Sequence, residues 1–287
     1  MASIDGINIG RLEASEVEQA LALTAEVGWN QTAEDWAFFL RCAQVYAARD
    51  VAGRLVATAA VLPYAGNSPG EPGFAWVSLV IVTKSQRGRG LGTRMLQRCI
   101  DELRNRSLPG LLDATPAGEK VYTPLEFTPV LRLQRWQGQG GGAGDCNGRV
   151  RLLRATELAR VGVLDASVFG AQREALLANL CERGGSRAFS LEDSSGYAIL
   201  RSGRIAAQLG PVVAANSRDA LVLIEAATAC VRGPLFIDVP DQHTRVAAWL
   251  HAHGFSSQRP FLRMLLGEIP PPGDPTRVFA ISGPEYG

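Results

Sequence analysis

One short segment of the chain combines glycine and arginine residues in a spacing that could bind phosphate. Residues 87–94 read RGRGLGTR, follow the apolar, β-branched run 77–82, and lead into residues with helical spacing. Because Gly88, Gly90 and Gly92 lack side chains, successive backbone N–H groups can converge at a helix N-terminus, where the helix dipole favours negative charge. The segment therefore predicts a strand, a phosphate-binding turn and a helix, in that order.

Two common phosphate-binding motifs do not match this turn. A dinucleotide fingerprint G-x-G-x-x-G that began at Gly88 would need glycine at position 93, where the chain has Thr93. A nucleotide triphosphate loop needs a glycine followed by Lys and then Ser or Thr, and no glycine of this region is followed by that pair. Both the Rossmann and the P-loop interpretations are excluded here.

The turn does match the pattern [QR]-x-x-G-x-[GA], which residues 87–92 fill directly after the predicted strand. In this it resembles the acetyl-CoA signature of the GCN5-related N-acetyltransferases (GNATs). The resemblance implies that backbone N–H groups of the turn hold the pyrophosphate of acetyl-CoA, and that the end of the strand pairs with the pantetheine arm. The cofactor-binding residues that it implies are Leu79, Val80, Ile81, Val82, Arg87, Gly88, Arg89, Gly90, Leu91, Gly92 and Thr93.

A second segment, residues 119–127 (EKVYTPLEF), resembles a later block of the same family. In that block a tyrosine lies a few residues before a Gly-Phe ending and faces the thioester sulfur. The resemblance makes Tyr122 the general acid for the departing thiolate. Glu126 stands where the family usually has glycine, so the turn departs from the pattern there. The alternative is that Tyr122 only packs at a helix end.

The resemblance implies direct transfer of acetyl from the thioester to an amine. The amine must attack in its neutral form, but a free alkylamine has a pKa of roughly 10, so a base or a water chain must accept a proton. Backbone N–H groups near residues 80–82 are expected to stabilise the oxyanion. Residues 77–82 contain no carboxylate, and Ser78 is their one polar side chain. The base stays open among five acidic residues, which are Glu26, Glu34, Asp35, Glu71 and Asp113.

The acceptor pocket is predicted from two places in the chain. Trp29 and Asn30 lie in a break between two predicted helices, where acceptors of the resembling family often bind. Asp238 and Asp241 lie at the end of a predicted strand of the second half and could attract a cationic amine, although a solvated loop explains them better. Ser78 completes the set of predicted acceptor-site residues.

At 287 residues the chain is expected to form two domains. We predict a catalytic domain at 1–137, a Gly-rich linker at 138–148 and a second domain at 149–287. The second half repeats the order of elements faintly and resembles the partner domain of a YitH/HolE-like subgroup of the family. Its equivalent of the glycine turn, residues 213–220 (VAANSRDA), has no glycine. One working cofactor site per chain is expected, with the second domain shaping the acceptor pocket.

The resemblance implies an α/β (α+β) fold of two tandem GNAT-like domains, each with a mixed, mostly antiparallel twisted sheet flanked by helices. Composition predicts a globular protein: 46% of the residues are hydrophobic and 20% charged, and the net charge of +1 suggests neither nucleic acid nor membrane as a partner. No long apolar stretch or signal sequence is found, so we expect a cytoplasmic monomer or homodimer. Five scattered cysteines and the pair His251 and His253 indicate neither disulfides nor a metal site.

The hypothesis from the sequence is an N-acetyltransferase that moves acetyl from acetyl-CoA directly to a primary amine of a small molecule. Two alternatives remain open. One is an acyl-CoA-binding regulatory or sensor protein without turnover, and the other is an acetyltransferase for peptide or protein amines.

Overall fold

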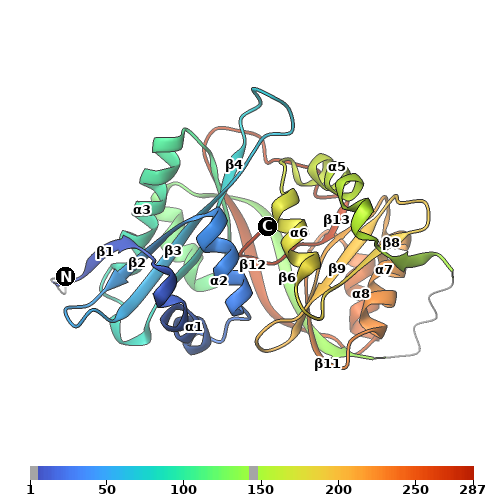
Figure 1. The fold of residues 1–287 in the computed structure, drawn as a ribbon, viewed down its shortest axis with the longest axis horizontal. Helices are drawn as coiled ribbons and strands as arrows, with labels where there is room; N and C mark the ends of the chain where they lie inside the picture. Colours follow the sequence, from blue (N-terminus) through green and yellow to red (C-terminus); the bar gives the residue numbers. More distant parts are fainter. Residues whose placement is uncertain (1–5, 142–147) are drawn as a thin grey trace.

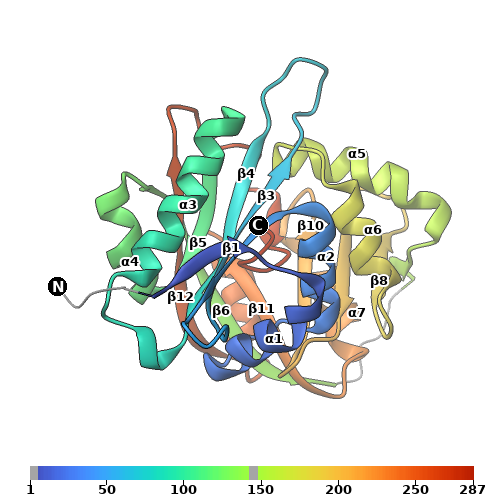
Figure 2. The same cartoon turned by 60° about the vertical axis from the view of Figure 1, so that its left-hand side comes forward.

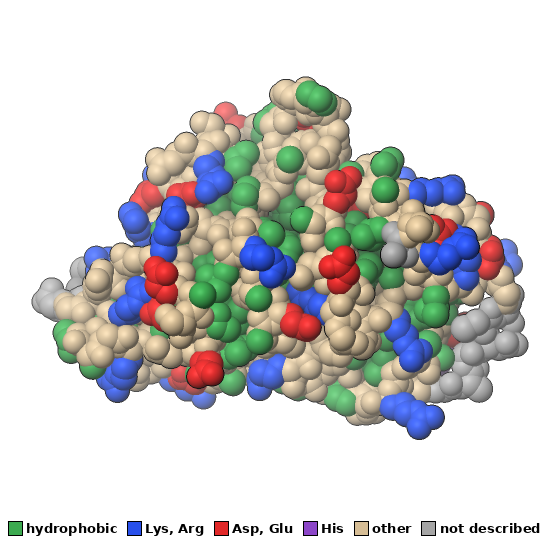
Figure 3. All heavy atoms as spheres, viewed as in Figure 1, with side chains coloured by type: hydrophobic (Ala, Val, Ile, Leu, Met, Phe, Trp, Pro, Cys, Tyr) green, Lys and Arg blue, Asp and Glu red, His purple; other side chains and the backbone are tan. Residues whose placement is uncertain are grey.

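The structure is a computed structural model that describes residues 6–141 and 148–287. The middle of the predicted linker, residues 142–147, lies outside the described residues. In the described ranges no helix is both long and apolar enough to cross a membrane. On the face seen in Figure 3, basic and acidic side chains are interspersed and form no large patch of one sign.

The first half contains a run of six strands and four helices (Figure 1). Its elements are β1 (Asn8–Arg11), α1 (Val17–Glu26), α2 (Ala33–Cys42), β2 (Gln44–Arg49), β3 (Leu55–Tyr64), β4 (Phe74–Val82), α3 (Leu91–Arg106), β5 (Gly110–Ala114), α4 (Pro116–Tyr122) and β6 (Thr128–Gly140). The strand and helix predicted on either side of the glycine turn are present as β4 and α3, and α3 buries one apolar side, which includes Met95, Leu96 and Ile100.

The second half repeats this order, as the sequence predicted, and adds a final short strand. Its elements are β7 (Val150–Leu152), α5 (Leu158–Phe169), α6 (Glu174–Glu182), β8 (Arg187–Leu191), β9 (Tyr197–Arg201), β10 (Ala207–Val213), α7 (Ser217–Ala229), β11 (Gly233–Pro240), α8 (Thr244–Ala252), β12 (Ser256–Leu266) and β13 (Val278–Ala280). The mixed, mostly antiparallel sheet flanked by helices confirms the predicted fold class.

The two halves exchange their last long strands. The sheet order is β1-β2-β3-β4-β5-β12-β6-β11-β10-β9-β8-β7, so β12 lies beside β5 of the first half and β6 lies beside β11 of the second. β6 extends to Gly140, because it pairs with β11 that far. Residues 138–140 are therefore strand and not linker, and β6 does not close a separate first sheet.

Helices cover both faces of the sheet (Figures 1 and 2). On one face α1 and α2 of the first half share a single apolar cluster with α5 and α6 of the second, through side chains such as Trp36, Phe39, Val168 and Leu177. On the other face α3 packs in its own cluster, and α7 and α8 pack in another. The shared cluster and the exchanged strands join the halves into one structure.

The centre of each half opens where two parallel strands separate. The described pairing between β4 and β5 is confined to Ala75 with Gly110 and Trp76 with Leu111. β10 and β11 also pair in parallel near their beginnings. Beyond this pairing, however, β13 pairs with β10 at Val212 and Val213, and Ile281 N donates to Asp238 O of β11 (3.0 Å). In the second half the chain itself thus occupies the opening.

Candidate active site

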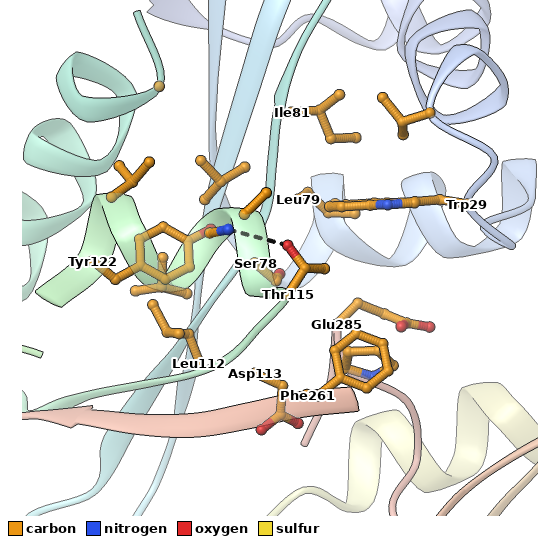
Figure 4. A pocket seen from close by; sticks show the side chains of 18 of the residues that line it. Trp29, Ser78, Leu79, Ile81, Leu112, Asp113, Thr115, Tyr122, Phe261 and Glu285 are labelled. Atoms are coloured by element: carbon orange, nitrogen blue, oxygen red, sulfur yellow. Dashed lines mark hydrogen bonds between the residues drawn. The ribbon is translucent and has the colours of Figure 1, made fainter. Parts of the chain in front are cut away.

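A cavity of about 580 Å³ lies where β4 and β5 separate (Figure 4). One end is formed by the glycine turn, through Arg87 and Gly92. The middle is lined by β4, β5 and α4, and the far end by the loop between α1 and α2 together with residues from β6, β12 and the segment after β13. The far-end residues are Trp29, Asn30, Gln31, Arg135, Arg259, Phe261, Pro284 and Glu285.

The glycine turn is built so that its backbone can approach a ligand. Gly88 (φ +72°) and Gly90 (φ +83°) are both in the left-handed region, and Gly90 is the N-cap of α3 without a side-chain capping hydrogen bond. Gly92 differs, because a Cβ there would meet only the Val82 Cγ2 at 3.7 Å, an ordinary contact. Packing within the protein does not require glycine at 92, and the space it leaves faces the cavity. These features fit a pyrophosphate at the start of the 16-residue helix α3.

The other predicted cofactor residues fall into two groups. Four of them, Leu79, Val80, Ile81 and Val82, line the cavity along β4. Five residues of the turn do not line it: Gly88, Arg89, Gly90, Leu91 and Thr93. Leu91 has its side chain buried in the core, so only its backbone could serve a ligand at the turn.

β4 contains a bulge in the middle of the cavity. The register with β3 steps from Thr58↔Ile81 to Ala60↔Ser78, so Leu79 and Val80 together face one residue of β3. Leu79 adopts φ +52°, which is uncommon for a branched residue. The Thr58 hydroxyl donates to Leu79 O at 2.8 Å and holds this conformation. The bulge thus changes the direction of the β4 backbone at Leu79 and Val80, which line the cavity.

Tyr122 lies at the C-terminal end of α4 and lines the cavity beside Ser78 (Figure 4). Its ring lies over Gly118, where an added Cβ would be 2.8 Å from Tyr122 Cε2 and 3.2 Å from its hydroxyl oxygen. Thr115 caps the helix by accepting from Gly118 N at 3.2 Å. Burial raises the pKa of the Tyr122 hydroxyl, which therefore remains a donor at neutral pH. Glu126 takes φ +69°, so the turn that usually has glycine keeps its left-handed form.

Two carboxylates line the cavity, Asp113 and Glu285. Both oxygens of Asp113 accept from Arg263, each at 2.9 Å. Glu285 accepts from Arg201 Nη2 at 3.0 Å through one oxygen. Burial raises the pKa of both carboxyl groups, against the opposing effect of these arginines.

Glu285 is the residue that sequence reasoning missed. Its segment is anchored from the first half, because Trp76 Nε1 donates to Pro284 O (2.9 Å) and the Tyr64 hydroxyl to Tyr286 O (2.8 Å). No motif surrounds Glu285 in the sequence, and these contacts join residues more than 200 positions apart. Only a fold that returns the chain from β13 to β4 reveals it.

The remaining candidate bases are placed outside the cavity lining. Glu26 accepts hydrogen bonds from Thr83 and from the backbone of Lys84. Asp35 is buried and accepts from Arg183 and from the Tyr286 hydroxyl; although burial opposes ionisation, Arg183 and Arg201 hold its pKa below the usual value. Glu34 and Glu71 do not line the cavity either. Of the five acids considered from sequence, the structure brings only Asp113 to the site.

The predicted acceptor residues of the first half all line the cavity, but in different roles. Trp29 faces the far end near Glu285 (Figure 4). The Asn30 side chain donates to Ala206 O (3.0 Å) and accepts from the backbone of Ile205 and Ala206, so it joins the two halves. Ser78 is buried, and its hydroxyl has no hydrogen-bond partner among the described residues.

The two aspartates predicted for the acceptor pocket do not line it. Asp238 is fully buried and binds Arg135 through two hydrogen bonds of 2.7 Å, with a third from Gln208. Asp241 is exposed. The prediction that these carboxylates face the acceptor is therefore wrong, because the charge of Asp238 is already paired and Asp241 follows the end of β11 in a turn. What Asp238 does is orient Arg135, which lines the cavity.

The start of α7, the equivalent of α3 in the second half, is closed. Asn216 caps it, and its side-chain oxygen accepts from Arg218 N (3.0 Å) and Asp219 N (3.1 Å). These are backbone donors of the kind that a bound phosphate would use at this helix end. Together with β13 in the adjoining opening, the cap leaves the second half without the features found at the glycine turn.

The described residues contain no group of three or more His, Cys, Asp or Glu side chains that could hold a metal ion. Their four cysteines, Cys42, Cys99, Cys181 and Cys230, are free thiols; Cys146 lies outside the described residues.

Comparison with known proteins relates both halves to one family. A model described as the acetyltransferase (GNAT) family matches residues 15–122, and one described as an acetyltransferase (GNAT) domain matches residues 161–280. The first match contains the glycine turn and Tyr122, and the second spans α7, β11 and β12.

Relatives that match nearly the whole chain agree with this assignment. The uncharacterized N-acetyltransferase YitH of Bacillus subtilis is 22% identical over 251 residues, covering 85% of this chain and 86% of its own. A putative acetyltransferase from Pyrococcus horikoshii superposes with a TM-score of 0.82 at 19% identity, over 100% of this chain and 98% of its own. A tandem GNAT protein from the clavulanic acid biosynthesis pathway gives 0.63 at 16% identity, over 92% and 99%. The chain therefore belongs to the GNAT acyltransferases, whose cosubstrate is acetyl-CoA, and carries two GNAT domains in tandem.

Proposed function

We propose that this protein transfers the acetyl group of acetyl-CoA to a primary amine of a small molecule, at one site per chain in the N-terminal half. The observation that carries this proposal is the continuity of the cavity. It runs from the glycine turn along the bulged edge of β4 to Tyr122, and on to the buried carboxylate of Glu285. In this proposal the phosphate-binding backbone, the thioester, the acid and the base lie along one cavity.

The chemistry follows from what each group can do. The backbone of the glycine turn binds the pyrophosphate, and the edge of β4 that lacks a β5 partner pairs with the pantetheine arm. The neutral amine attacks the carbonyl carbon, a C–N bond forms and the C–S bond breaks. Backbone donors at the β4 bulge stabilise the oxyanion. Tyr122 donates a hydrogen bond to the departing sulfur.

Glu285 accepts the proton that the amine must lose, directly or through a water. It is preferred to Asp113 because both oxygens of Asp113 are already bound by Arg263, whereas Glu285 accepts a side-chain hydrogen bond from Arg201 through one oxygen. Burial raises the pKa of the Glu285 carboxyl group and brings this pKa nearer to the pKa of the amine, which makes the carboxylate a better base. The base thus comes from the far end of the chain.

A single site per chain is supported by the second half. There β13 occupies the space between β10 and β11, and Asn216 satisfies the first N–H groups of α7. A small acceptor would fit the far end of the cavity, which residues of both halves line, among them Trp29, Phe261 and Glu285.

The test combines binding and turnover. Calorimetric titration with CoA should give one binding site per chain, and acetyl-CoA with a broad panel of primary amines should release free thiol. Two sites per chain would contradict the single-site proposal. Saturable CoA binding without thiol release for any amine would favour the sensor hypothesis, and release with amine-bearing peptides alone would favour the peptide acetyltransferase.

A further inference from the structure

The middle and the far end of the cavity contain polar side-chain atoms that have no hydrogen-bond partner among the described residues. Five buried side-chain polar atoms of the described residues have no hydrogen-bond partner, and three belong to residues that line the cavity: Gln31 Oε1, Ser78 Oγ and Arg259 Nε. Buried polar atoms are almost always paired in folded proteins. Their gathering in one cavity indicates that a polar ligand supplies the missing partners.

Of the three residues, Arg259 has the greatest need of a partner, because its side chain carries a charge. No described carboxylate lies within ion-pairing distance of it. The two acids that act electrostatically on Arg259, Asp238 and Glu285, are paired with Arg135 and Arg201 instead. Burial and the neighbouring charge of Arg135 lower the pKa of Arg259 to about 10. The guanidinium is thus a half-buried cation without a counter-charge.

The strand pairing places two arginines directly opposite each other. Arg259 of β12 is the cross-strand partner of Arg135 of β6, and like charges in such positions repel. Both guanidinium groups lie over the ring of Phe261, with Cζ 5.1 Å and 5.3 Å from its centroid. Asp238 balances Arg135, which leaves one positive charge at this end of the cavity to be balanced from outside the protein.

Negative charge lies at the same end. Glu285 and Phe261 are neighbours in the cavity wall, with Trp29 across from them (Figure 4). A molecule bound here meets a carboxylate that can attract an amine and an arginine that can bind an anion. Gln31 and Ser78 offer it hydrogen bonds without charge.

We propose that the acceptor is a small primary amine that also carries an anionic group, a carboxylate or a phosphate, and that Arg259 binds this group. This inference rests on the proposed acetyl transfer and names the class of its acceptor. The anion pairs with the Arg259 guanidinium, and the amine lies between Glu285 and the thioester. The two halves of the chain thus have different roles: β4 and α4 of the first half form the reaction centre, and β12 of the second half determines acceptor specificity.

The experiment compares amines in matched pairs that differ by the anionic group. Leucine with isoamylamine and phenylalanine with phenethylamine test the carboxylate, and O-phosphoethanolamine with ethanolamine tests the phosphate, each extended to a wider set of amino acids and amino phosphates. Thiol release is measured for the wild type, for Arg259→Gln, and for the control Arg245→Gln, which removes an exposed arginine of α8.

The wild type should have a higher kcat/KM for one class of anionic amine, either the carboxylate-bearing or the phosphate-bearing one, than for the matching neutral amines. Arg259→Gln should lower kcat/KM for these anionic amines by about tenfold to a hundredfold, mainly through KM, since hydrogen bonds to charged groups contribute that much. It should leave the neutral partners and CoA affinity unchanged, and Arg245→Gln should behave as the wild type. Equal kcat/KM for anionic and neutral amines, or an equal effect of Arg259→Gln on both, overturns the inference while the proposed acetyl transfer stands.

Binding provides a readout that does not need turnover. With CoA bound, anionic amines should raise the melting temperature of the wild type but not of Arg259→Gln. If that shift occurs and no thiol is released, the inference about the ligand holds and the proposed acetyl transfer fails. If neither class of amine shifts the CoA-bound protein, the inference is wrong.

Discussion

At the scale of single residues, Tyr122 depends on a glycine one helical turn before it. Side chains of a helix point back toward its N-terminus, so the residue at position 118 lies under the ring. Any Cβ there would come within 2.8 Å of the tyrosine ring. Gly118 therefore sets the position of the hydroxyl in the cavity, and the ring in turn rests on Phe127 with 6.1 Å between centroids.

Replacing Tyr122 by phenylalanine should lower kcat by about a hundredfold, which is the lower end of what a positioned proton donor contributes. CoA affinity and melting temperature should change little, because the ring remains. Tyr46→Phe is the matched control, because Tyr46 does not line the cavity. Its hydroxyl donates a hydrogen bond of 3.0 Å to Glu102. Steady-state kinetics at saturating acetyl-CoA provide the measurement, and a wild-type kcat in Tyr122→Phe would reduce Tyr122 to a packing residue.

Glu285 should give the reaction a characteristic pH dependence. A base acts in its ionised form, and burial raises the pKa of this carboxyl above its usual value of 4.5. The rate should therefore fall as the pH drops through that raised pKa, at a higher pH than an exposed carboxylate would produce.

Glu285→Gln should lose this acidic limb and should lower kcat by about a hundredfold or more. Comparing kcat profiles of the two proteins with the same amine cancels the titration of the amine itself. The exposed Glu268→Gln serves as control, and melting curves check that loss of the pairing with Arg201 has not unfolded the variant. An unchanged acidic limb in Glu285→Gln would exclude it as the base.

At the scale of elements, the two equivalent helix starts differ in what satisfies their first backbone N–H groups. The N-cap of α3 is Gly90, which provides no side-chain cap, whereas the N-cap of α7 is Asn216, whose side chain accepts hydrogen bonds from two backbone N–H groups. The unsatisfied donors at the start of a helix need some acceptor. In α7 the protein provides it, and in α3 we propose that acetyl-CoA does.

The role of Gly92 can be separated from stability. An alanine methyl group at 92 has room within the protein and suits a helix better than glycine. Gly92→Ala should thus leave the melting temperature without ligand unchanged or higher, and should weaken CoA binding at least tenfold by obstructing close approach of the phosphate. Gly184→Ala is the control, because a Cβ there meets nothing within 4 Å and its φ is ordinary. Equal CoA affinity in both variants would place the pyrophosphate elsewhere.

At the scale of the whole molecule, the exchanged strands make each half incomplete without the other. β12 covers the edge of β5, and its Arg263 binds the Asp113 carboxylate in the cavity. β6 in turn covers β11. The apolar cluster formed by α1, α2, α5 and α6 also crosses between the halves. The cavity is therefore a product of the complete chain.

Cutting the chain within 142–147 should give two fragments that fold only together. Residues 1–141 expressed alone should aggregate, because they expose the edge of β5 and half of an apolar cluster. Co-expression with residues 148–287 should restore a 1:1 complex that binds CoA. Size-exclusion chromatography and circular dichroism decide this, and a monomeric, folded fragment 1–141 would show that the exchange is dispensable.

The sequence by itself determined the features of the protein that depend on residues close together in the chain. The apolar run, the three glycines and the amphipathic helix predicted β4, its turn and α3, because local spacing dictates each of them. The repeat of elements and the family resemblance predicted a tandem fold, which the sheet and the family matches confirm. The family resemblance also predicted the glycine turn and Tyr122 as site residues, and Arg87, Gly92 and Tyr122 line the cavity.

Tertiary structure alone decided which distant residues meet at the site. Glu285 and Arg259 have no local signature, and they reach the cavity only because β12 crosses into the first half and the chain after β13 returns to β4. Asp238 and Asn30 could be located as polar residues, but only their partners Arg135 and Ala206 reveal that they hold the protein together. Charge pairing across more than a hundred residues of sequence is fixed by strand order and register, which no local pattern encodes.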